Sequence, residues 1–303
     1  MTTVSSDTPT NSQNRAHGIV MMLIANGMFG TMGLAHHFIT LGPATLASTR
    51  GIFGSLFVLL LMLAIRKKPD LAAIRKNFFP LLLSGAMIGI NWILLYEAYD
   101  RTGVTLATLF YYTAPVFMIL SSPLLGEKLT ARKLACAFVA LGGMACISGI
   151  FGGDVSGSWD GILCGLGAGL FYAAAVLVNK KLDGVGSYDR TLVQMFVAGA
   201  AVVPYALITE AEGIAQLSDP VVLLTAVAFG IVYSGIAYTA YFQGLGHLPV
   251  VIASLFGYID PSLTIILAAT VLHEAFGWTE LIGVVCIIGA MIVVELPGKK
   301  ETI

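Results

Sequence analysis

The chain has 303 residues, of which 57% are hydrophobic and only 11% are charged. Soluble domains carry roughly 25% charged residues, so this composition excludes a soluble fold and indicates a protein whose surface faces lipid. A formal net charge of −1 gives no support to nucleic-acid binding. The four cysteines lie in apolar runs without metal-ligand spacing, and they are predicted to be packing residues.

Apolar runs of spanning length alternate with short polar segments along the whole chain. A transmembrane helix needs about 20 mostly apolar residues, and we predict an all-α polytopic membrane protein with ten of them. The polar residues 1–16 are interpreted as a tail before a retained first helix, not as a removable signal peptide. In chain order, the predicted spans are 17–38, 43–65, 78–99, 103–125, 131–150, 160–179, 190–208, 220–242, 249–272 and 279–296.

Basic residues fall almost entirely in alternate connections. The two tails and every second loop hold nearly all of the 16 Lys and Arg residues, whereas the other loops hold only Arg101 and a span holds Arg50. Lys and Arg concentrate on the cytoplasmic side of membrane proteins. The pattern predicts an even number of spans in the plasma (inner) membrane, with both termini cytoplasmic.

The two halves of the sequence resemble each other at several places in the same order. Ala107–Pro115 (ATLFYYTAP) matches Ala253–Pro261 (ASLFGYIDP), and just before them Tyr96–Tyr99 matches Tyr238–Tyr241. Each half holds five predicted spans, so the second half must enter the membrane from the opposite side. Inverted repeats of this kind build alternating-access transporters with a binding site near the membrane midplane.

These motifs resemble the EamA branch of the drug/metabolite transporter superfamily over about residues 17–296. The resemblance rests on Leu109–Pro115 (LFYYTAP) followed by Leu125–Thr130 (LGEKLT), with echoes at Pro261 and His273–Glu274. It implies two inverted five-helix EamA repeats around a central cavity, and a small-molecule cargo that is mostly exported. The predicted units are a cytoplasmic tail (1–16), repeat 1 (17–150), repeat 2 (160–296) and a second cytoplasmic tail (297–303).

Two ionisable residues are predicted deep in the membrane, where a charge costs at least about 2.5–3.5 kcal/mol on insertion scales. Asp260 lies near the centre of the ninth span, and its counterpart in the first half is Ala114. Arg50 lies in the second span. Midplane acids in transporters commonly bind cations or carry protons. Asp260 and Arg50 could together grip the two ends of a zwitterion, or they could pair with each other.

Aromatic and amide side chains inside the spans complete the predicted substrate site. Tyr112 and Tyr258 occupy equivalent positions, three residues before a proline that is predicted to break the helix in each repeat. Packing is the alternative for the aromatic residues, and interhelical hydrogen bonding is the alternative for the asparagines. Tyr99 is predicted to lie in the interfacial aromatic belt, whereas Glu127 and Glu274 are predicted to cap helices. The other site candidates are Trp92, Tyr233, Phe171, Asn26 and Asn91. Two more aromatic residues deep in the spans, Tyr111 and Tyr172, are interpreted equally as cavity lining or as packing.

The favoured function is secondary transport: export of a small amphipathic metabolite, an amino acid or a related compound, by alternating access. The alternatives are an exporter of cationic drugs, an ion channel and an intramembrane enzyme. An enzyme is disfavoured because HExxH is absent and no second deep aspartate accompanies Asp260. Without a P-loop, ATP-driven pumping is excluded and no cofactor is predicted. Proton exchange and facilitated diffusion both remain open, and no obligate protein partner is indicated beyond cargo and lipid.

Overall fold

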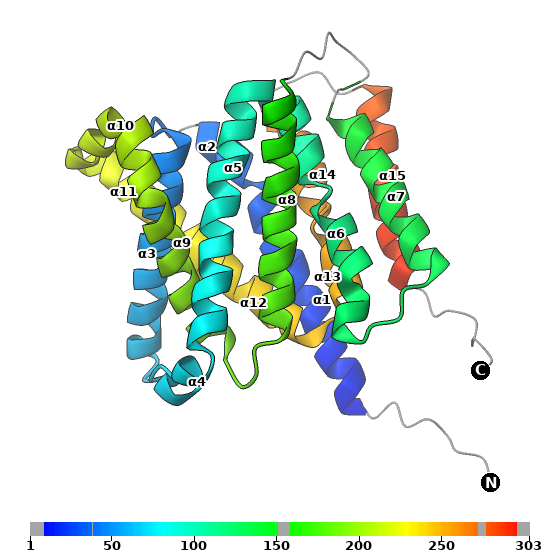
Figure 1. Ribbon diagram of the computed structural model, residues 1–303, viewed down its shortest axis with the longest axis horizontal. Helices are drawn as coiled ribbons and strands as arrows, with labels where there is room; N and C mark the ends of the chain where they lie inside the picture. The colour runs from blue at the N-terminus through cyan, green and yellow to red at the C-terminus, as the bar shows by residue number, and fades with distance from the viewer. Residues whose placement is uncertain (1–8, 38, 149, 151–157, 272–276, 296–303) are drawn as a thin grey trace.

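All regular structure in the described part of the chain is helical. The computed structural model describes residues 9–37, 39–148, 150, 158–271 and 277–295, and Figure 1 shows their helices standing side by side in one bundle. The all-α fold class predicted from the sequence is confirmed. The end segments 1–8 and 296–303, and the motif His273–Glu274, lie outside the described residues.

Short connections join the successive elements. The first half forms α1 (Pro9–Gly30), α2 (Met32–His37), α3 (Pro43–Ala64), α4 (Leu71–Lys76), α5 (Phe78–Tyr111), α6 (Ala114–Ser121), the 3₁₀ turn η1 (Ser122–Leu125) and α7 (Ala131–Ile147). The second half forms α8 (Trp159–Lys180), α9 (Ser187–Thr209), α10 (Ala211–Ala215), the 3₁₀ turn η2 (Gln216–Ser218), α11 (Pro220–Phe229), the π-helical segment η3 (Gly230–Ile236), α12 (Ala237–His247), α13 (Val250–Phe256), α14 (Ile259–Val271) and α15 (Trp278–Glu295).

Sequence signals explain several of the helix starts. The Thr130 side chain accepts a hydrogen bond from the Lys133 N–H and caps α7, and Ser158 caps α8 in the same way through Gly161. Such side chains satisfy backbone donors that the first turn of a helix leaves free. Helix α3 begins with a proline, which loses no hydrogen bond at that position.

Three breaks interrupt the long helices. Gly103 bends α5 with a φ of 73°, a conformation that glycine adopts without strain. The chain is interrupted again at Tyr112–Thr113, just before Pro115, and at Gly257–Tyr258, just before Pro261. Proline removes one helical hydrogen bond and crowds the preceding turn. The two proline breaks occupy equivalent positions, so the internal repeat is visible in the backbone as well as in the sequence.

Seven segments of the described chain are long and apolar enough to cross a membrane. Trp278–Val294 is a shorter apolar helix, while α1 and α7 are not among the seven. The ten-span count therefore stays a prediction. The seven candidate spans are Pro43–Ala64, Phe78–Gly103, Leu106–Leu125, Trp159–Lys180, Ser187–Thr209, Pro220–His247 and Val250–Val271.

Helices of one half pack against helices of the other half. Helix α3 packs on α9 and α7 packs on α15, while α5 packs on α8 and α1 packs on α12 and α14. An added Cβ on Gly51 would lie 2.7 Å from the Gly199 Cα, and one on Gly143 would lie 2.7 Å from the Gly283 carbonyl oxygen. Small residues at such crossings allow close helix approach in membranes. Because α3–α9 and α7–α15 join corresponding helices, the packing fits two inverted repeats.

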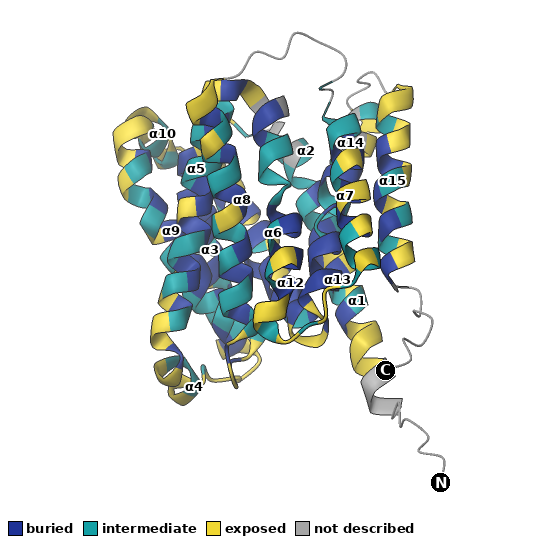
Figure 2. Ribbon diagram, turned by 45° about the vertical axis from the view of Figure 1, so that its right-hand side comes forward, coloured by how far each residue is buried: buried dark blue, intermediate teal, exposed yellow. Residues whose placement is uncertain are grey.

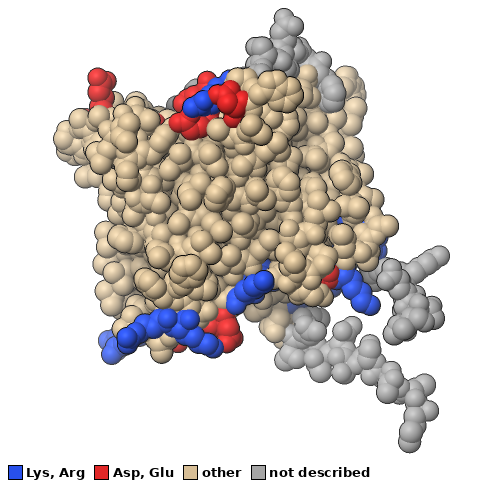
Figure 3. All heavy atoms as spheres, in the orientation of Figure 1, with Lys and Arg blue, Asp and Glu red and all other residues tan. Residues whose placement is uncertain are grey.

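The bundle has apolar outer faces between two charged ends. Figure 2 shows buried residues between the helices and exposed residues mainly on outward faces, where Leu60, Phe79 and Val285 are among the exposed side chains. Figure 3 shows Lys and Arg gathered at the end that carries α4, where α1 begins and α15 ends. The charge asymmetry is thus present in three dimensions, and the orientation derived from it stays a prediction.

Candidate functional site

A cavity of about 610 Å³ lies inside the bundle, lined by side chains from α1 to α3, α5 to α8 and α11 to α14. Its walls include residues late in α1, in the first two turns of α3 and in the last turn of α7, so it extends toward the end opposite α4. In the other direction the lining reaches Ala253 and Ser254, one turn into α13. On α3 and α5 the lining ends at Arg50 and Trp92, so the cavity reaches into the bundle from the end opposite α4 and is closed toward the α4 end.

Five residues of the predicted substrate site line this cavity. They come from α1, α3, the middle of α5, the break after α5, and the first turn of α14. Helices that are distant in sequence thus bring these side chains to one space. The five residues are Asn26, Arg50, Trp92, Tyr112 and Asp260.

Arg50 is a buried cation without an acidic partner in the described chain. Its side chain lies against the face of Trp92, with the guanidinium carbon 4.0 Å from the ring centroid. Nη1 lies 3.0 Å from the sulfur of Met32, a weak acceptor. Nε is buried and has no hydrogen-bond partner. The guanidinium therefore keeps hydrogen-bonding capacity beside the cavity.

Asp260 lies in the first turn of α14, and the hydroxyl groups of Tyr112 and Thr264 face its carboxyl group. The Thr264 hydroxyl also lies 2.9 Å from the carbonyl oxygen of Gly30, which ties α14 to the end of α1. Among the described residues no ion pair joins Asp260 to Arg50. The acid and the base face the same cavity separately.

Four other predicted site residues lie outside the cavity lining. Asn91 donates to the carbonyl oxygen of Ala168 at 2.7 Å, the interhelical bond that was its alternative interpretation. The fully buried Tyr258 donates to the Tyr112 carbonyl oxygen at 3.0 Å, and its ring stacks on the Tyr112 ring. The remaining two are Tyr233, whose hydroxyl lies 2.9 Å from that of Thr31, and the half-buried Phe171.

Six tyrosines outside the nine predicted site residues line the cavity, and the sequence interpretation offered lining as one alternative for two of them, Tyr111 and Tyr172. Tyr172 donates to the Tyr241 hydroxyl at 2.9 Å, and the Phe29 ring packs edge-on against Tyr238. The prediction that Tyr99 belongs to an interfacial belt is wrong, because its side chain faces the cavity. The match between Tyr96–Tyr99 and Tyr238–Tyr241 could have indicated four of these tyrosines, because residues three apart share a helix face. The six are Tyr96, Tyr99, Tyr111, Tyr172, Tyr238 and Tyr241.

Two charged side chains hold the corner between α12 and α13, next to the deep end of the cavity. Glu127 accepts hydrogen bonds from the Val250 N–H at 2.6 Å and the Val251 N–H at 3.4 Å. Lys180 donates to the carbonyl oxygens of Leu245 and Leu248 at 2.8 and 2.6 Å. The negative group thus meets a helix N-terminus and the positive group a helix C-terminus, as the helix dipole favours. The predicted capping role of Glu127 is confirmed.

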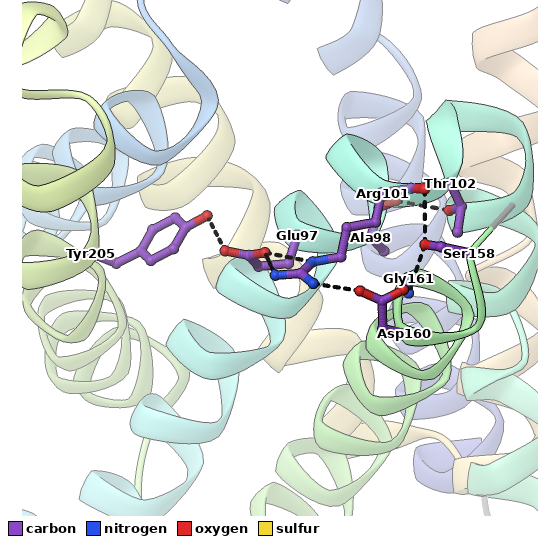
Figure 4. Close-up of polar contacts among 8 residues, drawn as sticks. All are labelled: Glu97, Ala98, Arg101, Thr102, Ser158, Asp160, Gly161 and Tyr205. Carbon is purple, nitrogen blue, oxygen red and sulfur yellow. Dashed lines mark hydrogen bonds and ion pairs between the residues drawn. The ribbon is translucent and has the colours of Figure 1, made fainter.

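A second polar network joins three helices at the opposite end (Figure 4). Arg101 forms ion pairs with Glu97 on its own helix and with Asp160 at the start of α8. Tyr205 on α9 donates to Glu97 at 2.9 Å, and Ser158 donates to the Arg101 carbonyl oxygen at 3.0 Å. This network braces α5 against α8 and α9 just before the bend at Gly103.

Comparison with known proteins points to transport. The model of the EamA-like transporter family matches the chain twice, over residues 16–149 and 159–296. The uncharacterized transporter YxxF of Bacillus subtilis is 26% identical over 305 residues, covering 98% of this chain and 96% of that protein. Protein PecM of Dickeya dadantii is 28% identical over 222 residues, covering 71% and 73%. Protein RarD of Escherichia coli is 22% identical over 278 residues, covering 90% and 91%.

The fold is shared with solved structures as well. One crystal structure superimposes with a TM-score of 0.80 over 94% of this chain and 96% of its own, at 18% identity. That likeness concerns the fold alone. The two family matches cover both halves and nearly the whole chain, and the chain therefore belongs to the EamA-like transporter family, a family of membrane transporters.

Proposed function

We propose that the protein is a plasma-membrane secondary transporter that exports a small amphipathic metabolite carrying both a carboxylate and an amine, most simply an amino acid. The observation that carries the proposal is that Arg50 and Asp260 face one cavity without pairing with each other. A zwitterion would neutralise both groups at once, and neither a plain cation nor a plain anion would do so.

The base supports recognition of a carboxylate. A buried charge is costly unless it is paired, and Arg50 has no acidic partner among the described residues. The planar guanidinium matches a carboxylate through two parallel N–H···O bonds. A bound carboxylate would complete the coordination that the protein leaves unfilled.

The acid and the tyrosines support recognition of an ammonium group. The carboxyl of Asp260 lies beside the Tyr112 hydroxyl in a wall rich in aromatic rings. Cations bind favourably to carboxylates and to the faces of aromatic rings. The remaining lining is largely apolar, with side chains such as Leu46, Met118 and Ile147, which suits an amphipathic cargo.

The shape of the cavity supports alternating access between the two repeats. The lining extends to the end opposite α4, while Glu127 and Lys180 hold a closed corner at the α4 end. With the orientation predicted from the basic residues, this is an outward-facing state. Cargo would leave from it, and the inward-facing state would require the α12–α13 corner to part from Glu127.

A single experiment tests the proposal. Purified protein in liposomes is assayed with a radiolabelled amino acid, its decarboxylated amine and its deaminated acid, with and without a pH gradient. We expect saturable transport of the amino acid, with Arg50→Gln selectively weakening recognition of the carboxylate and Asp260→Asn that of the amine.

A cationic-drug exporter is the second candidate, favoured by the tyrosine wall around Asp260. Transport of amines and quaternary cations without transport of amino acids, left unchanged by Arg50→Gln, would overturn the amino-acid proposal in favour of this one. Non-saturable flux of every compound would instead indicate a channel.

A further inference from the structure

The environment of Arg50 contains a feature that the proposed function does not explain. Arg50 is only 7% exposed, and its one close contact with a π face is Trp92, which is 4% exposed. Buried arginines are normally held by carboxylates, whereas here an aromatic ring occupies the place of a partner. Trp92 therefore contacts the guanidinium in a way that a carboxylate in the same place would not.

The difference lies in what each partner leaves free. A carboxylate binds a guanidinium along its edge, using the same N–H donors that a cargo carboxylate needs. An aromatic ring binds the guanidinium through its face, and the N–H donors at the edge stay available. No acceptor in the described chain binds the buried Nε of Arg50, so no carboxylate of the protein occupies that edge.

Trp92 itself is firmly held. The neighbouring Asn91 anchors this turn of α5 to α8 through the Ala168 carbonyl oxygen. On the cavity side the Tyr238 ring meets the Trp92 ring in a T-shaped contact, with centroids 6.5 Å apart. A ring fixed in this way fixes the plane and position of the guanidinium above it.

We propose that Trp92 is a positioning residue that holds Arg50 unpaired and oriented, and so determines selectivity for cargo with a carboxylate. The proposal rests on the proposed function, because it assumes that Arg50 reads a carboxylate of the cargo. Trp92 acts through Arg50, and its effect is on the choice between cargoes more than on the overall rate.

The test measures a preference, which a purely structural role would not change. Trp92→Leu and Trp92→Phe are compared in liposomes with the wild type and with Arg50→Gln, using the ratio of kcat/KM for the amino acid to that for its decarboxylated amine. Trp278→Leu is the matched control, because Trp278 is 79% exposed at the start of α15.

We expect Trp92→Leu to shift the ratio about tenfold toward the amine, the effect of losing one desolvated cation–π contact. Trp92→Phe keeps a π face and should retain most of the preference, and Trp278→Leu should leave it unchanged. An equal loss for both compounds in Trp92→Leu, with the ratio unchanged, overturns the proposal.

The outcomes separate this proposal from the proposed function. An Arg50→Gln variant with an unchanged ratio shows that Arg50 does not read a carboxylate, and the proposed function fails. A shifted ratio in Arg50→Gln with an unchanged ratio in Trp92→Leu overturns the positioning role alone. If Trp92→Leu does not accumulate in the membrane, Trp92→Met is used instead, because methionine fills the volume without a π face. The same kcat/KM ratio, measured in Trp92→Met, then tests the positioning role.

Discussion

Glu127 joins the loop after η1 to the first turn of α13, and its removal should open the cavity toward the α4 end. Its carboxylate receives the N–H groups of Val250 and Val251 at 2.6 and 3.4 Å. These amides belong to the first turn, where no helical acceptor is available. No other carboxylate in the described part of the chain accepts from these two amides, so Glu127→Ala leaves both donors without their acceptor.

The size of the effect follows from the two contacts. Capping groups are worth about 0.5–2 kcal/mol, and the short bond to Val250 involves a full charge, which places Glu127 in the upper half of that range. A change of about 1.4 kcal/mol shifts a two-state equilibrium about tenfold. Glu127→Gln keeps one amide oxygen as acceptor and should shift the equilibrium less than Glu127→Ala.

Cysteine accessibility measures this shift. Ser254 lines the deep end of the cavity and is 2% exposed, so a cysteine at this position in a background without the four native cysteines reports opening. A membrane-impermeant maleimide added from the α4 side should label the Glu127→Ala protein about tenfold faster than the parent protein. Glu212→Gln, at an exposed glutamate of α10, is the matched control and should not change the rate.

Two results would refute this reasoning. Unchanged labelling of Ser254→Cys in both Glu127 variants would show that the contact with α13 does not hold the cavity closed. Faster labelling from the side opposite α4 would show that Glu127 stabilises the other state.

Three further predictions concern the acid, the repeat contact and the topology. Asp260→Asn should accumulate normally in the membrane, with transport reduced at least about tenfold and any pH dependence flattened, because an amide cannot exchange a proton; normal transport in liposomes would make Asp260 a packing residue. Tyr258→Phe keeps the ring stacked on Tyr112 but loses the bond to its carbonyl oxygen, so thermal unfolding in detergent should show a loss of about 1 kcal/mol of stability, and an unchanged Tm would contradict this. Reporter fusions at the C-terminus and at Gly153, which lies outside the described residues, should fall on opposite sides of the membrane; placement on the same side would overturn the predicted span count.

The sequence predicts the breaks and the cavity better than it predicts which side chains line the cavity. Pro115 and Pro261 interrupt their helices where the repeat comparison indicates, and Tyr112 and Asp260 then fall on the cavity wall. These positions follow from backbone chemistry, because proline cannot continue the hydrogen-bond ladder whatever surrounds it. Breaks in a helix are local properties, and a single sequence contains them.

Which face of a membrane helix points into the cavity, unlike the position of a break, is not a local property of the sequence. Phe171 and Tyr172 are adjacent aromatic residues that the sequence places equally deep in one span, yet only Tyr172 lines the cavity, and Phe171 is half-buried elsewhere. Adjacent residues point about 100° apart on a helix, and a soluble helix reveals which side faces inward through its polar stripe. A membrane helix is apolar toward lipid and toward protein alike, so periodicity could not orient α8. Asn91 shows the same limit, since its amide bonds to the Ala168 carbonyl oxygen, the interhelical alternative, and Asn91 lies outside the cavity lining.

The internal repeat separates two classes of residue in the cavity. Tyr96 and Tyr238 match across the halves, as do the proline breaks, and these shared features shape the cavity from both repeats. The charges are not shared: Asp260 has Ala114 as its counterpart, and Arg50 has an apolar one. Two inverted copies must interchange conformations for alternating access, which requires equivalent hinges in both, whereas a cargo binds in one orientation and needs each charge only once. Symmetry is therefore expected of the residues that bend and pack, and its absence at Arg50 and Asp260 supports the proposal that these two bind the cargo.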